Sequence, residues 1–350
     1  MKHEPLYTVC TRCFTYNQAS YILDALNGFV AQQTDFPVVY TIVDDASTDG
    51  EPQILRDYFN DNFVVDDSAV AYQEEADFGT VFYAQHKVNK NCFFAILLLK
   101  DNHYSQKKSK LPYLTRWNDN AKYIALCEGD DYWIDPLKLQ RQVDYLESHP
   151  LCMLVTHPAS WRTGDEIYAA GCQDSSPKDY SIDELIRRGG YYFATASFVF
   201  RSELNNDWPK WRREANVGDF PLQILAGMRG NVHSLPYSMC IYRYQSEGSW
   251  SSNQNNKEQR ISYHKNKIKW MTLLNQDTSH KYQEAIYDQL FQHYNFLYNL
   301  RMISTLDYMK IVRRSGNKRY GRLLKDIVRV ELTPVYRLLA CFKIINKKNV

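Results

Sequence analysis

Short runs of apolar residues alternate, over the first 250 residues, with segments whose apolar positions recur at helical spacing. Leu6–Arg12 and Val38–Val43 are rich in β-branched residues and predict strands, and the amphipathic stretch Tyr21–Gln32 between them predicts a helix. Phe93–Leu99 and Tyr123–Cys127 predict two further buried strands. Such a strand–helix–strand order predicts an α/β fold with a mostly parallel sheet flanked by helices.

A further helix is expected after Asp135-Pro136, because Pro is favoured at the first helical position and Asp at the N-cap. Its buried face would carry Leu139, Val143 and Leu146. The polar, interrupted stretches 60–92 and 101–120 are expected to be loops with short elements.

The pattern changes near residue 253, after which strand signals nearly vanish and apolar residues recur at helical spacing to the end. Residues 251–350 hold 19 Lys and Arg against 7 Asp and Glu, a net of +12, whereas residues 1–250 hold 23 against 33, a net of −10. We therefore predict two domains with different partners, an acidic α/β domain over 1–252 and a basic helical region over 253–350.

The composition, with 44% apolar and 23% charged residues, is typical of a globular protein. Met1–Pro5 has no apolar stretch typical of a signal peptide, and Phe93–Leu99 falls far short of the roughly 20 residues that span a bilayer. We expect a cytoplasmic protein, soluble or peripheral to a membrane, whose eight cysteines are reduced.

The strongest local motif is Glu128–Trp133 (EGDDYW), directly after a predicted strand. Ligands of open parallel sheets bind at the carboxyl ends of strands. Two adjacent carboxylates there repel each other, and a hard divalent cation such as Mg²⁺ or Mn²⁺ offsets that repulsion. A turn of solvated acids is the alternative interpretation.

A second acidic motif, Val43–Gly50 (VDDASTDG), also follows a predicted strand. Its alternative is a turn whose Asp and Ser cap the next helix. The first strand ends in Thr15–Asn17 (TYN), without the glycine-rich signatures of dinucleotide oxidoreductases or P-loop ATPases. Both of those classes are disfavoured.

Together these segments resemble glycosyltransferase family 2, whose catalytic domain has the Rossmann-like GT-A fold. The TYN and VDDASTDG segments look like that family's nucleotide-binding half. Glu128–Gln140 (EGDDYWIDPLKLQ) looks like the variant of its metal motif in many bacterial surface-polysaccharide enzymes. The resemblance covers roughly residues 5–252.

By position, the resemblance implies that Asp45 contacts the nucleoside base, with Phe14 and Tyr16 framing its pocket. It implies that Asp131 binds Mn²⁺ or Mg²⁺ and that Asp130 faces the donor sugar or ribose. A cation also makes physical sense, because a diphosphate donor brings about two negative charges into an acidic domain.

Two further segments gain roles from the resemblance. Asp219, in Val217–Leu222 (VGDFPL), would be the general base that deprotonates the acceptor hydroxyl, and a helix N-cap is the compatible alternative. Arg243, in Tyr242–Ser251 (YRYQSEGSWS), would contact the diphosphate.

Two tryptophans, Trp133 and Trp250, are candidates for stacking on sugar faces, with burial in the core as the alternative. His103, His157 and His233 are isolated in sequence and are expected to be core residues rather than metal ligands.

The expected activity is that of an inverting glycosyltransferase, which uses a nucleotide-diphosphate sugar, with UDP favoured, and a saccharide or lipid-linked acceptor. The resemblance implies cell-surface, capsular or lipopolysaccharide synthesis. The alternatives are a non-catalytic nucleotide-sugar-binding or scaffold member of the same fold and a sugar-phosphate nucleotidyltransferase, which would need a glycine-rich phosphate loop that Thr11–Asn17 lacks.

The basic tail, residues 318–350, combines apolar residues at helical spacing with interspersed Lys and Arg. A helix of this kind can lie on an anionic membrane, here the inner face of the plasma membrane, and can equally pack on the catalytic domain with a solvated basic face. No module typical of nucleic-acid binding is evident.

Overall fold

The computed structural model describes residues 4–65, 70–169, 176–244, 246, 256–315 and 320–332. The chain divides into two compact units. The first comprises Met1–Ser181, Gly190–Asp207 and Leu225–Asn253, and the second comprises Ile182–Gly189, Trp208–Ile224 and Gln254–Val350. The unit of the C-terminal helices thus also includes two segments that precede residue 253.

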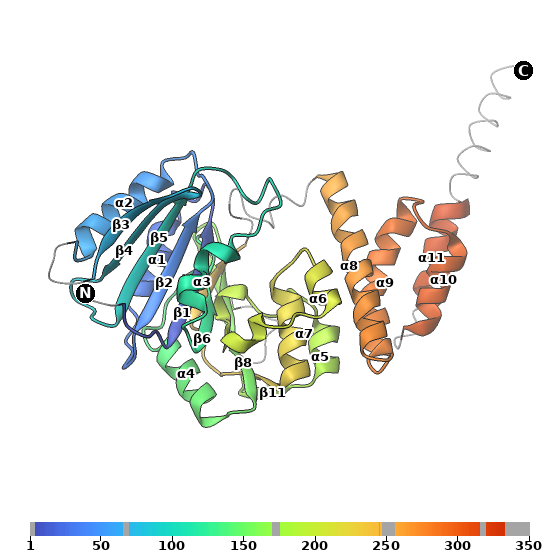
Figure 1. Cartoon of the computed structure of the whole chain (residues 1–350). Helices are drawn as coiled ribbons and strands as arrows, with labels where there is room; N and C mark the ends of the chain where they lie inside the picture. Colours follow the sequence, from blue (N-terminus) through green and yellow to red (C-terminus); the bar gives the residue numbers. More distant parts are fainter. Residues whose placement is uncertain are drawn as a thin grey trace, which may run out of the picture. The chain divides into compact units, whose positions relative to one another are not determined.

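The first unit is built on a ten-stranded sheet of order β11-β13-β8-β12-β6-β1-β2-β5-β4-β3 (Figure 1). Its centre is parallel and consists of β6 (Tyr123–Leu126), β1 (Val9–Thr15), β2 (Val38–Asp44) and β5 (Cys92–Leu99). All residues of β2 and β5 are buried, as expected for parallel strands covered on both faces. The predicted α/β class and these four strands are confirmed.

Three helices connect and cover these strands: α1 (Ile22–Val30), α2 (Glu51–Asn62) and α4 (Lys138–Ser148). The predicted inward residues of α4, Leu139, Val143 and Leu146, are buried. The helix begins at Lys138 rather than at Pro136, because the Asp135 carboxylate accepts the Leu137 N–H (2.8 Å) in a turn that precedes it.

A hairpin of β3 (Tyr72–Ala76) and β4 (Gly79–Gln85) extends the sheet antiparallel to β5. The expectation of loops with short elements over 60–92 did not specify this hairpin, because the exposed centre of β3 (Gln73, Glu74, Glu75) is polar. Charged residues on an edge strand discourage pairing with other chains. The stretch 101–120 holds only a 3₁₀ turn (Leu111–Leu114) and α3 (Thr115–Asn118), as expected.

The other end of the sheet contains β8 (Cys152–Thr156), β12 (Val199–Arg201), β13 (Asn231–Ser234) and β11 (Lys178–Tyr180). A second, four-stranded sheet has the order β10-β9-β14-β7, with β7 (Tyr132–Trp133), β9 (Ala159–Thr163), β10 (Glu166–Ala169) and β14 (Cys240–Arg243). Because Tyr132 pairs with Ile241 across β7 and β14, the end of β14 lies beside the acidic turn before β7.

The second unit is helical and comprises α5 (Ile182–Arg188), α6 (Lys210–Glu214), the start of α7 (Asp219–Arg229), α8 (Lys257–Asp277), α9 (Gln283–Asn299), α10 (Thr305–Arg314) and α11 (Tyr320–Ile327) (Figure 1). A π-helical turn, Val328–Leu332, follows α11. A core of this unit is formed by Phe291, Tyr298, Tyr308, Val312, Leu323 and Val330. The predicted helical character of the C-terminal region is confirmed.

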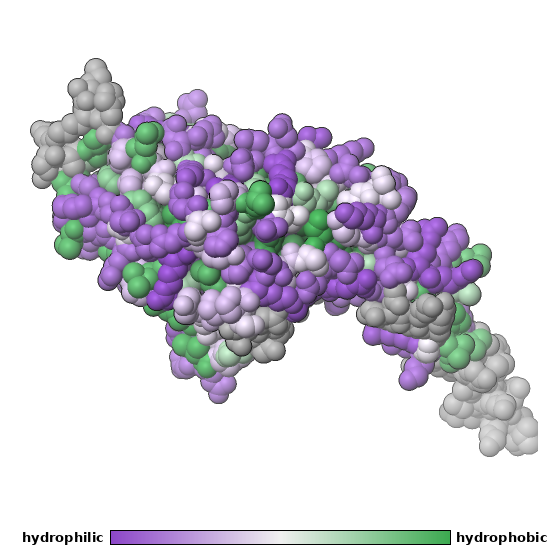
Figure 2. Space-filling model, turned by 90° about the horizontal axis from the view of Figure 1, so that it is seen from below, coloured by the Kyte–Doolittle hydropathy of each residue, from purple (hydrophilic) through white to green (hydrophobic). Residues whose placement is uncertain are grey.

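Among the described residues, no helix combines the length and apolar character needed to cross a bilayer. The face of the molecule in Figure 2 is mostly hydrophilic, with apolar residues in small separate groups. Six of the cysteines lie in the described part of the chain, and all six are buried and free, as expected.

Candidate active site

The loops that follow β1 and β2 are joined by hydrogen bonds. The Asn17 N–H donates to Ser47 Oγ (2.8 Å), and Asn17 Oδ1 accepts the Thr48 N–H (2.8 Å). The Ala19 N–H donates to the Asp49 carboxylate (2.9 Å). Several polar residues of VDDASTDG therefore hold the two loops together.

Glu51, the first residue of α2, lies fully buried beneath these loops, and the sequence motifs did not point to it. Its carboxylate accepts the Gln18 N–H (2.8 Å) and the Ser47 hydroxyl (3.0 Å) and contacts the Thr15 hydroxyl. Burial raises the pKa of Glu51. The Thr15 hydroxyl also lies 2.8 Å from Gln18 Oε1. A hydroxyl has one proton and cannot donate to both oxygens, so a protonated Glu51, which can itself donate to Thr15 Oγ1, would satisfy all of these groups.

Asp45 is 1% exposed, and its carboxylate has three donors from the segment 103–110. It accepts the N–H groups of His103 (2.7 Å) and Tyr104 (3.0 Å) and the Nζ of Lys110 (2.8 Å). Lys110 also lies 5.3 Å from the centroid of the Phe14 ring. Asp45 thus fixes the segment 103–110 against the end of β2.

The two aromatic residues expected to frame the base differ in exposure. Phe14 is half-buried beside Lys110, whereas Tyr16 is 41% exposed. The structure therefore brings together Phe14 and Asp45 of the predicted base pocket, adds Lys110, and leaves Tyr16 at the surface.

Asp130 and Asp131 are both buried. Burial raises the pKa of Asp130, although a hydrogen bond from Ser246 Oγ (2.7 Å) opposes the shift. Burial, together with repulsion from Asp130, raises the pKa of Asp131 well above its ordinary value, and Glu128 adds to this repulsion. Ionising both carboxylates of this acidic turn is therefore unfavourable without a nearby positive charge.

The acidic turn adjoins the loop after β1 because residue 129 is a glycine. A Cβ at Gly129 would collide with Thr15 Oγ1 and Gln18 Oε1. The Gly129 N–H donates to Phe14 O (3.1 Å), and the Asp45 N–H donates to Thr15 O (3.0 Å). The end of β1 is thus bonded to both acidic segments, which share one edge of the sheet.

Arg243 reaches the acidic turn through the pairing of β14 with β7. Its N–H donates to Asp131 Oδ1 (2.9 Å), and its guanidinium donates to the carbonyl of Asp130 (2.6 Å) and pairs with Asp24. The guanidinium also lies 4.6 Å from the Tyr132 ring centroid. The structure brings Arg243, Asp130 and Asp131 together and adds Asp24, a partner that sequence spacing could not reveal.

Asp219 is the first residue of α7 and lies half-buried in the second unit. Burial raises its pKa, and the positive charge of Lys267 partly opposes this shift. Lys267 is itself buried beside the rings of Phe220 and Trp270, and burial lowers its pKa to about 8. The structure therefore adds the positive charge of Lys267 to the surroundings of Asp219.

Trp133 is a core residue in this structure. It is 3% exposed, its Nε1 donates to Ala196 O (2.9 Å), and its ring packs on Phe29 and beside the Lys138 ammonium. A ring so buried has no open face for a sugar, which favours the core interpretation over stacking. Trp250 lies outside the described residues.

The three histidines expected in the core are all buried. His103 nevertheless belongs to the site, through its N–H on Asp45 and through its ring nitrogen near Tyr113 Oη (2.9 Å). His157 is completely buried, and His233 pairs with Asp179 (2.7 Å).

Within the described ranges, no three His, Cys, Asp or Glu side chains gather as a complete metal site. The acidic turn nonetheless fits a hard cation, since Mg²⁺ typically takes one or two protein carboxylates and completes its shell with phosphate oxygens and water. Burial raises the pKa of both Asp130 and Asp131, and a cation beside them would favour their ionised forms.

Sequence comparisons relate the chain to a known family and to uncharacterized relatives. Residues 14–72 match the family model described as Glycosyl transferase family 2. Relatives named "Uncharacterized protein Rv1520" in Mycobacterium tuberculosis (strain H37Rv) and "Uncharacterized protein Mb1547" in Mycobacterium bovis are each 34% identical over 249 residues, which is 68% of this chain. The chain spans 59% of the length of these relatives.

Among solved structures, the crystal structure of S. aureus TarS 1-349 in complex with UDP-GlcNAc is similar, with a TM-score of 0.54 and 13% sequence identity. The match covers 91% of this chain and 81% of that one. At this identity the likeness concerns the fold. Over residues 14–72 the chain is thus similar to glycosyltransferase family 2, and its fold is similar to that of TarS.

Proposed function

We propose that this chain is an inverting glycosyltransferase that moves a sugar from a nucleotide-diphosphate donor onto an acceptor hydroxyl. The observation that carries the proposal is the pair of buried, repelling carboxylates Asp130 and Asp131 at the sheet edge that also holds Asp45. Ligands of open α/β sheets bind at this edge. The UDP-GlcNAc complex of the similar TarS structure makes a UDP-sugar the favoured donor.

The nucleoside would lie at the ends of β1 and β2. Phe14 offers a half-buried ring, and Asp45 with Lys110 offers a fixed polar wall beside it. Tyr16 is exposed and would cover the base from the solvent side. This assignment keeps the expected roles and adds Lys110 to them.

Asp131 would hold a Mn²⁺ or Mg²⁺ ion, with Asp130 directed at the ribose or the donor sugar. A bound cation supplies positive charge that stabilises the departing nucleotide. Arg243 is held at the same turn by Asp24 and the Asp130 carbonyl, which keeps its guanidinium next to the place assigned to the diphosphate.

Asp219 keeps the proposed role of general base. Its raised pKa makes it a stronger base than a surface aspartate, and its ionised form is stabilised by Lys267. Attack by the deprotonated hydroxyl on the face opposite the leaving group would invert the anomeric centre.

The proposal extends to cell-surface, capsular or lipopolysaccharide synthesis, with a saccharide or lipid-linked acceptor and a peripheral contact of residues 318–350 with the inner face of the plasma membrane. In the described part of that segment, Leu324, Val328 and Leu332 follow one another at four-residue intervals and are exposed. Lys325 and Arg329 lie between them in sequence. An apolar stripe with basic neighbours suits an anionic lipid surface.

The direct test is incubation of the full chain with Mn²⁺ and a panel of UDP- and GDP-sugars, with nucleotide release and thermal unfolding as readouts. We expect one donor to raise the unfolding temperature only when the metal is present and to release its nucleotide. A donor that binds equally well with the metal chelated would refute the cation site. Donor binding without any nucleotide release would favour the scaffold alternative.

A further inference from the structure

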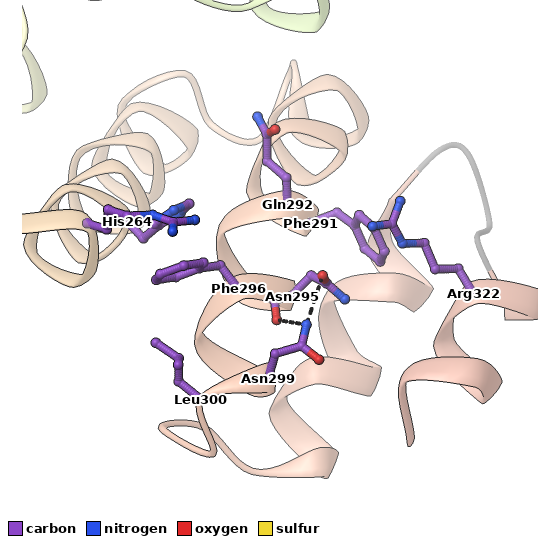
Figure 3. A pocket seen from close by; sticks show the side chains of 9 residues that line it. His264, Phe291, Gln292, Asn295, Phe296, Asn299, Leu300 and Arg322 are labelled. Carbon is purple, nitrogen blue, oxygen red and sulfur yellow. Dashed lines mark hydrogen bonds between the residues drawn. The ribbon is translucent and has the colours of Figure 1, made fainter. Parts of the chain in front are cut away.

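The second unit contains a groove along one face of α9 (Figure 3). A hollow of about 470 Å³ is lined by Leu300, which follows α9, and by residues of α8, α9 and α11, namely Arg260, His264, Phe291, Gln292, Asn295, Phe296, Asn299 and Arg322. A second hollow of about 400 Å³ shares Arg322 and is otherwise lined by Lys325, Asp326 and Arg329. Volumes of this size are typical of small-ligand sites.

The groove is rich in exposed positive charge. Arg260 lies over the Phe296 ring (4.8 Å) and has no acidic partner within the described part of the chain. Arg322 and Arg329 have side chains that are 61% and 60% exposed. Lys325 is exposed beside them.

Among the described residues that line the two hollows, one carboxylate occurs, and it already has its own partners. Asp326 is buried, and its oxygens accept from Asn295 (2.6 Å), Tyr308 (2.8 Å) and Arg329 (2.7 Å). Arg322 approaches it only to 4.0 Å. The guanidinium of Arg322 is therefore available to an anion that enters the groove.

The floor of the groove offers groups that suit sugar hydroxyls. Asn295 is engaged with Asp326. On the same face of α9, Gln292 donates to Gln289 Oε1 (3.1 Å), and Asn299 donates to Asn295 O (2.8 Å) and accepts from Arg329 (2.7 Å). Both of these amides are exposed and could exchange such bonds for bonds to a ligand. Figure 3 shows Phe296 and Leu300 at the side of these amides, and because Arg260 and His264 cover the Phe296 ring, the apolar surface there is chiefly that of Leu300. A bare phosphate ion would use the arginines alone, whereas a sugar ring would use the amides and the apolar surface as well.

We propose that this groove binds an anionic saccharide, one that carries phosphate or carboxylate groups, as the growing acceptor chain. The saccharide part of the inference rests on the proposed glycosyltransferase function. Basic side chains on both sides of the exposed amides fit a chain in which charged groups alternate with sugar rings.

A nucleic acid suits the groove less well, because single strands bind through bases that stack on open aromatic rings. The Phe296 ring is covered by the stacked His264 ring and by Arg260. The Arg322 guanidinium lies 5.6 Å from the centroid of the Phe291 ring. Stacking of bases would have to displace these side chains.

The test is calorimetric titration of the full chain with five probes: a phosphate-bearing oligosaccharide, a uronate-bearing one, a neutral one, inorganic phosphate and single-stranded RNA. We expect one of the two anionic oligosaccharides to bind at least about tenfold more tightly than the other probes. Arg260→Gln and Arg322→Gln should each weaken that binding about tenfold, as expected for the loss of a hydrogen bond between charged groups. The matched control is Arg313→Gln, an exposed arginine of α10 outside the groove, which should bind unchanged.

Equal binding of RNA, of inorganic phosphate or of the neutral oligosaccharide would overturn the proposal. A loss of binding in Arg313→Gln as large as that in the groove variants would overturn it as well.

Slow hydrolysis of the donor by water, measured without an acceptor, reports on the donor site separately. Loss of donor hydrolysis with intact saccharide binding would refute the proposed function alone. Intact hydrolysis without saccharide binding would refute this inference alone.

Discussion

Two pairs of adjacent aspartates lie at the same sheet edge, and their surroundings differ. Asp45 of the first pair receives two backbone N–H groups and the Lys110 ammonium. Asp131 of the second pair receives the Arg243 N–H, while the Arg243 guanidinium is bound to the Asp130 carbonyl and to Asp24. The first carboxylate is thus paired directly with an ammonium group, whereas the second is only partly offset by Arg243 and faces the like charge of Asp130.

This difference separates two roles that the sequence motifs alone do not distinguish. A balanced carboxylate organises its surroundings and offers a fixed polar surface, which suits recognition of a nucleoside. An unbalanced buried pair stores unfavourable electrostatic energy that a bound cation removes, which suits metal binding. The two pairs should therefore respond differently to the same chemical change.

The largest expected contrast is in turnover. Asp131→Asn should lower kcat about 10³-fold, because the proposed cation that stabilises the leaving nucleotide would lose its main ligand. Asp45→Asn should chiefly raise the KM for the donor, by about tenfold. Steady-state kinetics with the best donor from the panel would measure both values.

Asp57→Asn is the matched control for turnover, because this exposed residue of α2 undergoes the same chemical change and belongs to neither pair. It should keep full activity. A kcat for Asp45→Asn as low as that of Asp131→Asn would break the assigned division of roles.

The second contrast is in stability, with opposite signs at the two pairs. Asp45→Asn should lower the free energy of unfolding by about 2 kcal/mol, because an amide nitrogen would meet N–H and ammonium donors in a buried site. Asp131→Asn should leave it unchanged or raise it by about 1 kcal/mol, because a buried repulsion is removed. Urea unfolding without metal or nucleotide would show the two signs, and equal losses at both sites would contradict the contrast.

The third contrast is in the pH dependence of cation-assisted nucleotide binding. The raised pKa values of Asp130 and Asp131 mean that protons compete with the cation at a higher pH than at an ordinary aspartate. Binding of UDP with Mn²⁺ should therefore weaken as the pH falls, by about tenfold per unit once the critical carboxylate protonates.

The same shifts fix the sign of the effect on folding. A carboxyl whose pKa is higher in the folded than in the unfolded state costs stability while ionised, and this cost disappears as the pH falls through the folded-state pKa. Asp130→Asn removes one cause of the raised pKa of Asp131. The curve of UDP binding with Mn²⁺ against pH should therefore move to lower pH in this variant. Parallel titrations of the two proteins by calorimetry would measure the displacement, and coincident curves would contradict the proposed repulsion.

Elements whose pattern is local could be predicted from the sequence. The buried strand β5 is a continuous apolar run, and Leu139, Val143 and Leu146 mark the inner face of α4. The polar strand β3 could not be predicted, because an exposed edge strand carries no apolar alternation. A hydrophobic pattern indicates burial, and it therefore misses elements that stay at the surface.

The site was predictable only where residues are close in sequence. The adjacent carboxylates Asp130 and Asp131 are visible in the motif, but the partner of Arg243, Asp24, lies 219 residues away. Lys110 belongs to a segment without a recognisable pattern, and Glu51 follows its motif as an ordinary helix residue. Such partners are set by the tertiary fold, which a single sequence does not display.

The smallest effect is expected from Lys110→Met, which tests how much the Lys110 ammonium stabilises the ionised Asp45 carboxylate. The Lys110 side chain is only 15% exposed, but the two N–H donors remain on Asp45 when the ammonium is removed. The free energy of unfolding should fall by about 1 kcal/mol in urea unfolding. Lys108→Met, a change at an exposed neighbour, should have no effect.

The double variant sharpens this last prediction. Combining Lys110→Met with Asp45→Asn should cost less than the sum of the single changes, since the new amide would no longer face an ammonium group. Strict additivity in urea unfolding would show that the backbone donors alone balance Asp45. The lysine would then be free to serve the nucleotide directly, and its loss would raise the KM for the donor without changing stability.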